Sequence, residues 1–390
     1  MTLSRREWFE RTLQGLALAL AGGGLSGRTR AEAASAATGP LITRVTRPFD
    51  AETPVQEFAS WLTPNERLFV RSHFGPPNPE AVDPATWRLT VGGRVETPLT
   101  LTLDEIKRDF EAVSITAVLQ CSGNGRAFHR PKVPGVQWER GAVGNVQWTG
   151  VRLTDLLQRA KLKGQALHVQ LQGADRPALS TVPLFVRSIP LEKAMHPDTL
   201  LAYEMNGRPL PLLHGAPMRV ITPGWMAESC IKWLTEITVQ SAEASGYYMQ
   251  TAYRIPVTAV QPNSGLPGTT MMPVEAMPVK SLIAAPAEGA TVGRGPVTIQ
   301  GVAWAGDVTV EKVEVSVDDG KTWDLARLVG NEQRYAWRQW QYLWTPKAPG
   351  AAAILCRATD ARGETQPAST AWNPSGFLWN GWDRVMVTVA

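Results

Sequence analysis

The chain has 390 residues, of which 44% are hydrophobic, and its formal net charge is +4. This length predicts two domains, and the scattered Lys and Arg residues give no reason to expect a nucleic-acid partner. Cys121, Cys230 and Cys356 lie far apart without a CxxC or CxxCH motif, and the five histidines show no metal-ligand spacing. These patterns exclude a zinc ribbon and covalently attached c-type haem.

The first 33 residues have the features of an export signal. A twin-arginine pattern at residues 4–9 precedes a short apolar run at 15–25 and a small-residue cleavage site at 31–33. The apolar run is too short to span a bilayer. We therefore predict a Tat signal peptide over residues 1–33 and a periplasmic mature protein without a membrane span.

Short apolar stretches separated by turn-forming residues predict a mixed α+β domain over residues 40–255. Strands are expected at 67–73, 87–93, 99–103, 115–119, 166–171, 184–189, 200–205 and 230–239. Short helices are expected at 104–110, 154–160 and 191–195, and a Tyr-rich segment at 246–254 ends the domain.

Residues 256–277 are rich in Pro and Gly and are predicted to be a linker or loop. Longer strands are then expected at 297–304, 308–317, 335–344, 353–359 and 385–389, with an Asp-Asp-Gly hairpin turn at 318–320. This regular spacing predicts an immunoglobulin-like β-sandwich over residues 278–390.

Cys121 follows an apolar strand and begins a loop of small, turn-forming residues that ends at Arg126, with Arg130 and Lys132 beyond it. Such a loop lets the backbone approach a ligand closely. A thiol beside several cations is expected to have a lowered pKa, and a thiolate is a nucleophile or a soft metal ligand. Taken alone, however, the stretch is more typical of a small buried cysteine in an ordinary turn.

Arg71, His73, His214, Arg219 and Tyr253 each have a simpler structural interpretation, as an ion pair, a hydrogen-bonded histidine, a strand cap or a core residue. Together with one thiol they form a set rich in cations, and this set favours binding of an oxyanion. The sequence has no GxSxG motif and no prominent carboxylate pair, which argues against a serine hydrolase and a glycosidase.

The motif Gln-Cys-Ser-Gly-Asn at residues 120–124, with Arg126, resembles the molybdenum loop of the sulfite oxidase family. The resemblance continues at 71–73, 136–143, 148–153, 201–207, 214–219 and 232–234. Residues 301–304, 319–323 and 372–374 resemble the dimerisation domain of the same family. The match covers nearly all of the chain after the predicted signal peptide.

This resemblance implies a molybdenum–molybdopterin cofactor without haem, with Cys121 as the protein ligand to the metal. The residues implied to hold the cofactor are Phe69, Val70, Arg71, Ser72, His73, Cys121, Asp175, His214, Arg219, Cys230, Ile231 and Lys232. Arg71, Arg126 and Tyr253 match the substrate pocket. Ser375 stands where eukaryotic members often have an Arg, so one cation of that pocket is either missing or replaced.

The function implied is oxidation of sulfite to sulfate by oxygen-atom transfer, in a homodimer that passes electrons to an external c-type cytochrome. This would make the chain similar to the haem-free bacterial sulfite dehydrogenases. Two alternative enzymes are considered. A sulfane dehydrogenase of thiosulfate oxidation shares the fold, and a periplasmic sulfoxide reductase shares the Cys loop. The sulfoxide reductase is disfavoured by residues 278–390. A third alternative is an exported binding or adhesion protein that has lost its cofactor.

Overall fold

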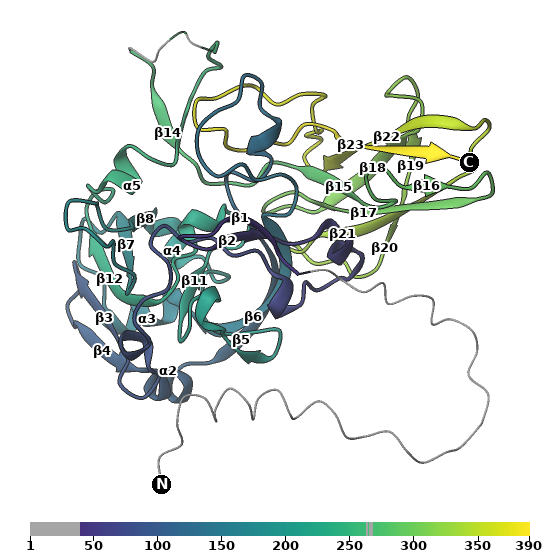
Figure 1. Ribbon diagram of the computed structural model, residues 1–390. Helices are drawn as coiled ribbons and strands as arrows, with labels where there is room; N and C mark the ends of the chain where they lie inside the picture. The colour runs from purple at the N-terminus through teal and green to yellow at the C-terminus, as the bar shows by residue number, and fades with distance from the viewer. Residues whose placement is uncertain (1–39, 263, 265–267) are drawn as a thin grey trace, which may run out of the picture. The chain divides into compact units, whose positions relative to one another are not determined.

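The computed structural model describes residues 40–262, 264 and 268–390. The predicted signal peptide lies outside these residues. Figure 1 shows the strands and helices in chain order. No helix in the described part of the chain is long and apolar enough to cross a membrane.

Two five-stranded sheets form the first part of the described chain, up to about residue 255. One has the order β10-β9-β6-β5, with β11 also pairing with β9, and contains β5 (Ala112–Gln120), β6 (Val143–Arg152), β9 (Leu200–Met205), β10 (Arg208–Pro209) and β11 (Arg219–Ile221). The other has the order β4-β3-β12-β7-β8 and contains β3 (Arg88–Gly93), β4 (Leu99–Thr102), β7 (His168–Gly173), β8 (Val186–Pro190) and β12 (Leu234–Gln240). A separate antiparallel pair joins β1 (Ile42–Val45) to β2 (Asp50–Glu52).

The helices here are short, as the sequence predicts. The α-helices are α2 (Leu103–Asp109), α3 (Leu153–Ala160), α4 (Leu191–Met195) and α5 (Tyr247–Gln250). Thr102 and Glu105 form a capping box that fixes the start of α2. Leu153, Leu156 and Leu157 on α3 are fully buried in the core of the second sheet. Single 3-10 turns are η2 (Val55–Ala59), η3 (Asn65–Arg67), η4 (Pro79–Val82), η5 (Arg126–Phe128), η6 (Leu212–His214) and η7 (Ala227–Ser229).

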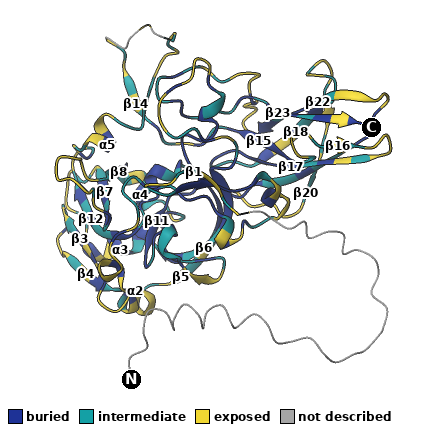
Figure 2. Ribbon diagram, viewed as in Figure 1, coloured by how far each residue is buried: buried dark blue, intermediate teal, exposed yellow. Residues whose placement is uncertain are grey.

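The C-terminal part of the chain is a sandwich of two sheets. The four-stranded sheet has the order β15-β17-β21-β20 and contains β15 (Lys280–Ala285), β17 (Val297–Trp304), β20 (Arg327–Val329) and β21 (Arg338–Trp344). The five-stranded sheet has the order β16-β23-β22-β18-β19 and contains β16 (Thr291–Val292), β18 (Val310–Ser316), β19 (Asp324–Leu325), β22 (Gly350–Asp360) and β23 (Asp383–Val389). Their facing sides bury an apolar core (Figure 2), as expected for aligned sheets. The predicted fold class, a mixed domain followed by a β-sandwich, is confirmed.

Three segments differ from their predictions. Residues 67–73 form no strand beyond one bridge between Val70 and Ala51, because Arg67 belongs to the turn η3 and the Ser72 N–H donates to the Asp50 carboxylate instead of a strand carbonyl. The strand predicted at 230–239 begins only at Leu234, since residues 230–233 turn towards the pocket described below. The predicted linker includes β14 (Met271–Pro273), which pairs with β13 (Arg254–Pro256).

Candidate active site

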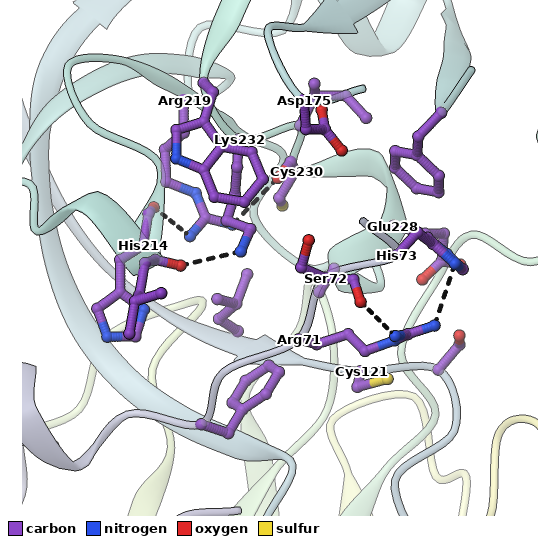
Figure 3. Close-up of a pocket in the computed structure, with 18 of the residues that line it drawn as sticks. Arg71, Ser72, His73, Cys121, Asp175, His214, Arg219, Glu228, Cys230 and Lys232 are labelled. Atoms are coloured by element: carbon purple, nitrogen blue, oxygen red, sulfur yellow. Dashed lines mark hydrogen bonds between the residues drawn. The ribbon is translucent and has the colours of Figure 1, made fainter. Parts of the chain in front are cut away.

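All but two of the residues implicated by the sequence line a single pocket, and the exceptions are Val70 and Arg126. Figure 3 shows two groups of polar side chains in it. We call the first the thiol end, defined by Arg71, His73, Cys121 and Tyr253. We call the second the cation end, defined by His214, Arg219 and Lys232.

The Cys121 loop turns sharply where β5 ends. The backbone N–H of Asn124 donates to the Cys121 carbonyl at 2.9 Å, and Cys121 N–H donates to Ala142 O at 3.0 Å. Gly125 has φ +94°, and a Cβ atom there would lie 2.5 Å from the Trp379 ring. A glycine is therefore required both for the backbone conformation and for the space. The result is a thiol placed at the pocket wall, as the small residues of the loop predict.

The C-terminal sandwich and the segment that precedes β23 hold this loop at four points. Trp304 Nε1 donates to Gln120 Oε1 at 2.6 Å, and Leu378 N–H donates to Ser122 O at 2.9 Å. Two further bonds run from Lys280 Nζ to Asn124 O at 3.5 Å and from Arg126 Nε to Ser375 O at 3.0 Å. The conformation of the loop thus depends on residues more than 150 positions away in the sequence.

The electrostatic environment of Cys121 corrects one prediction. The side chain is buried, and burial raises the pKa of the thiol above its ordinary value, although Arg71 and Arg126 act to lower it. The predicted lowering of this pKa is wrong for the chain alone, because loss of water outweighs the two guanidinium charges. A metal ion on the sulfur would reverse this balance, since a coordinating thiol is deprotonated outright.

Arg71, His73 and Tyr253 form a hydrogen-bonded chain at the thiol end. Arg71 Nη2 lies 3.2 Å from His73 Nδ1, and His73 Nε2 lies 2.8 Å from the Tyr253 hydroxyl. Burial and the Arg71 charge lower the pKa of His73 to about 3, so the imidazole is neutral. Because a guanidinium can only donate, Nδ1 is the acceptor and Nε2 carries the proton that it donates to Tyr253. The tyrosine O–H is therefore free to donate into the pocket.

Aromatic rings enclose this chain. His73 stacks on Phe185 with a centroid distance of 4.8 Å, and Tyr253 lies parallel to Phe377 at 5.4 Å. Burial raises the pKa of Tyr253 well above its ordinary value, which keeps the phenol protonated. Tyr253 also has φ +53°, an unusual backbone conformation for a bulky residue. Packing and backbone together fix the direction of its hydroxyl.

Asp50, which the sequence analysis did not single out, holds Arg71 in place. Its carboxylate accepts from Arg71 Nη1 at 2.9 Å and from the Ser72 N–H at 3.0 Å, and the side chain is 1% exposed. Arg71 Nη1 also donates to the Ser72 carbonyl. Arg71 also has a side-chain hydrogen bond to Tyr253, so Asp50, His73 and Tyr253 together fix its guanidinium beside the thiol.

The cation end is buried and lacks acidic neighbours within ion-pair distance among the described residues. Arg219 donates to the carbonyls of His214 and Cys230, both at 3.0 Å, and Lys232 Nζ donates to Leu213 O at 2.9 Å (Figure 3). Burial, followed by the Arg219 charge, lowers the pKa of Lys232 to about 7. The Nε atom of Arg219 is buried and has no partner in the described part of the chain. Buried cations in this state favour an anionic ligand.

The other implicated residues have simpler surroundings. Phe69, Ser72 and Ile231 line the wall, while Val70 lies behind it and pairs with Ala51. Asp175 lines the pocket near Lys232, and burial raises the pKa of its carboxyl to about 6.

Arg126 and Cys230 also make contacts within the protein. Arg126 lies beside the pocket, with Nε and Nη1 donating to the carbonyls of Ser375 and Val136. The Cys230 sulfur lies 3.3 Å from the Thr222 hydroxyl. Phe185 and the buried acid Glu228 also line the pocket, and neither was predicted as a site residue. A lone acid in the otherwise apolar and small residues 225–231 was the signal available for Glu228.

Comparisons with known proteins bear directly on this site. The profile described as the oxidoreductase molybdopterin binding domain matches residues 74–248, and the one described as the Mo-co oxidoreductase dimerisation domain matches 271–390. The mitochondrial sulfite oxidase of Macaca fascicularis is 39% identical over 361 residues, 88% of this chain. The sulfite oxidase of Arabidopsis thaliana is 31% identical over 87% of this chain and 92% of its own length. The chain belongs to the sulfite oxidase family.

Two details refine this membership. The chain spans only 65% of the length of the Macaca enzyme. The solved structure of the sulfane dehydrogenase SoxCD from Paracoccus pantotrophus matches with a TM-score of 0.76 and 27% sequence identity, over 88% of this chain and 85% of that one. Proteins that are named after different substrates thus share this architecture.

The molybdopterin-binding domain implies a molybdenum–molybdopterin cofactor, and the pocket fits it. The buried cation end, with its unpartnered Arg219 Nε, suits the phosphate and other anionic groups of a pterin cofactor. Gly215 leaves room for the Lys232 side chain at this end, because a Cβ atom at residue 215 would lie 3.0 Å from Lys232 Cβ. Cys121 supplies the soft sulfur donor at the thiol end.

Proposed function

We propose that this chain is a haem-free, bacterial-type sulfite dehydrogenase that passes electrons to an external c-type cytochrome. In the overall reaction sulfite and water give sulfate, two protons and two electrons. When bound, the cofactor supplies a redox-active molybdenum that transfers an oxygen atom and takes up the two electrons. The protein supplies binding, orientation and electrostatics.

The observation that carries this proposal is the joining of a soft thiol to oriented donors in one pocket. Arg71 is fixed by Asp50, His73 and Tyr253, and its guanidinium lines the pocket, where its charge suits an oxyanion. Tyr253 keeps its O–H for the reacting oxygen because His73 supplies the other bond. Donors fixed before the reaction stabilise developing negative charge without reorganisation.

The cofactor would be held mainly by the cation end. Lys232 and Arg219 would meet its anionic groups, with His214 beside them, while Cys121 would bind the metal. Burial and the neighbouring cations lower the pKa of His214 to about 3, so this imidazole is neutral and acts through hydrogen bonds. Arg126 would act from beside the pocket, through its charge.

Sulfite is favoured as the substrate by the relatives. This chain spans 92% of the length of the Arabidopsis protein named sulfite oxidase. Sulfite oxidation therefore fits a chain of this length. The dimerisation profile supports a homodimer, and the twin-arginine pattern supports export to the periplasm. Sedimentation at the monomer mass would refute the dimer.

The likeness to SoxCD favours a second candidate, a sulfane dehydrogenase of thiosulfate oxidation. One experiment separates the candidates. Purified, metal-analysed protein is mixed with a c-type cytochrome and either sulfite or a protein-bound sulfane substrate. About one molybdenum per chain with sulfite-dependent reduction supports the proposal. If only the sulfane substrate leads to cytochrome reduction, the second candidate function is favoured. If the protein contains no molybdenum, a binding protein is favoured.

A further inference from the structure

Glu228 is a buried acid in the pocket wall that the function proposed above does not use. It lies in the turn η7, lines the pocket and is 6% exposed. Its carboxylate interacts with the Ser122 hydroxyl and its own backbone N–H, but it has no cation within ion-pair distance among the described residues. Buried carboxylates without a paired cation are costly, so such a group calls for a functional explanation.

The nearest opposite charge does not satisfy Glu228. Arg187 on β8 is 1% exposed and has the largest charge effect on this carboxyl, but it forms no ion pair with it within 4 Å. Arg187 instead donates to Tyr248 O at 2.7 Å, lies over the Tyr253 ring at 5.5 Å, and keeps an unpartnered Nε. The hydroxyl of Ser122 interacts with the Glu228 carboxylate. This carboxylate therefore has one hydroxyl partner and a nearby guanidinium charge with which it forms no ion pair.

Charged groups continue from Glu228 towards the surface. Glu275 is half-buried and interacts with Arg187 and Arg254, and its carbonyl accepts from the Met226 N–H at 2.7 Å. Glu243 forms a hydrogen-bonded ion pair with Arg254, and its side chain is 28% exposed. Charge interactions thus link Glu228 through Arg187, Glu275 and Arg254 to Glu243, which is partly exposed to solvent.

We propose that Glu228 accepts the protons released in the pocket and passes them past Arg187 and Glu275 to Glu243 and solvent. This inference rests on the proposed function, because it is that reaction which consumes a water and releases two protons. An O–H bond of the water breaks and an O–H bond forms on the Glu228 carboxylate, one proton at a time. The electrons leave separately, to the external cytochrome.

The electrostatics agree with this role. Burial raises the pKa of the Glu228 carboxyl to about 7, with Arg187 and Ser122 opposing and Glu275 adding to the rise. Cys121 and Tyr253 also interact with this carboxyl. A group that titrates near the working pH exchanges protons in both directions most readily.

The test compares the loaded wild-type enzyme with Glu228→Gln. We expect unchanged molybdenum content, little change in KM for sulfite and a kcat lowered about 10²- to 10⁴-fold, in the range of lost acid–base catalysis. The wild-type kcat should fall as the pH drops below neutrality, where Glu228 is already protonated, and the variant should lose this dependence. Glu228→Asp should recover part of the rate, and Glu275→Gln should lower it less.

Infrared spectroscopy gives a readout independent of turnover. The wild type should show the band of a protonated buried carboxyl that titrates near neutral pH and is missing from Glu228→Gln. The matched control is Glu57→Gln, which alters a buried acid that pairs with Arg67 outside the pocket and should keep the wild-type pH profile.

An unchanged kcat and pH profile in Glu228→Gln, loss of molybdenum from it, or absence of the infrared band would each overturn the inference. A wild-type enzyme that loads molybdenum but does not oxidise sulfite would instead refute the proposed function, while the infrared titration would still report on Glu228.

Discussion

The two ends of the pocket use positive charge in different ways. At the thiol end, Arg71 is bonded to Asp50 and His73 and has little freedom to move. At the cation end, Arg219 and Lys232 donate to backbone carbonyls, and no described carboxylate pairs with them. The first end is arranged before its ligand arrives, whereas the second is electrostatically complete only with an anion bound. Substitutions at the thiol end should therefore affect turnover, and those at the cation end should affect cofactor loading.

The largest effect is expected for Cys121→Ser. Loss of the single soft sulfur in the Cys loop should abolish sulfite-dependent cytochrome reduction and leave the fold intact. Turnover is measured with the cytochrome, and the fold by circular dichroism. Retained turnover would remove Cys121 from its assigned role.

Arg71→Gln and Tyr253→Phe should each lower kcat/KM by about 10²–10³-fold, the usual effect of removing a donor aimed at developing charge. Both variants should keep their molybdenum, since the cation end is untouched. Metal analysis beside steady-state kinetics checks this. If the metal is lost instead, the two residues belong with those that hold the cofactor.

Lys232→Met should act on loading and on the pH dependence of stability. In the cofactor-free protein the pKa of Lys232 is about 7, below its unfolded value near 10.4. The unfolded chain then binds more protons between these values, so stability rises with pH across that window. The variant should lose this rise, contain less molybdenum and turn over normally per metal bound. Denaturant titrations at several pH values measure the first effect, and an identical pH slope in the variant would contradict it.

The smallest effect is expected for Trp304→Phe, which removes a support of the Cys loop from outside the pocket. Loss of its bond to Gln120 should lower the free energy of unfolding by about 1–3 kcal/mol because a buried oxygen loses its donor. The expected change in kcat is much smaller than for Tyr253→Phe. Trp340→Phe, which removes a bond to Ser281 within the sandwich, is the matched control for stability. A larger kcat loss in Trp304→Phe than in Tyr253→Phe would contradict this ranking of the two regions.

The sequence predicts the fold class and most of the pocket for identifiable reasons. Alternating apolar residues mark the strands, and the spacing of the Leu residues marks the helix α3. Burial alone decides these elements. The motif around Cys121, and the resemblance that it carries, brings distant residues such as His214 and Tyr253 into one site. Asp50 and Glu228 carry no such motif. Their importance comes from burial beside Arg71 and Arg187, which only the folded chain creates.

The same limit explains the error about the thiol of Cys121. Neighbouring cations can be read from the sequence, but the loss of water around the sulfur cannot. The strand predicted at 230–239 begins too early for a related reason. Residues 230–233 form part of the pocket wall, and a local pattern does not distinguish a wall from a strand.

The bonds that tie the Cys loop to residues near the C-terminus have a consequence for biogenesis. Gln120, Ser122 and Arg126 reach their final partners at positions 304, 378 and 375, respectively, so the loop cannot be completed until almost the whole polypeptide has left the ribosome. Metal insertion is therefore expected to be a post-translational event. A nascent chain stalled before residue 300 should fail to retain molybdenum even when its first two sheets have formed.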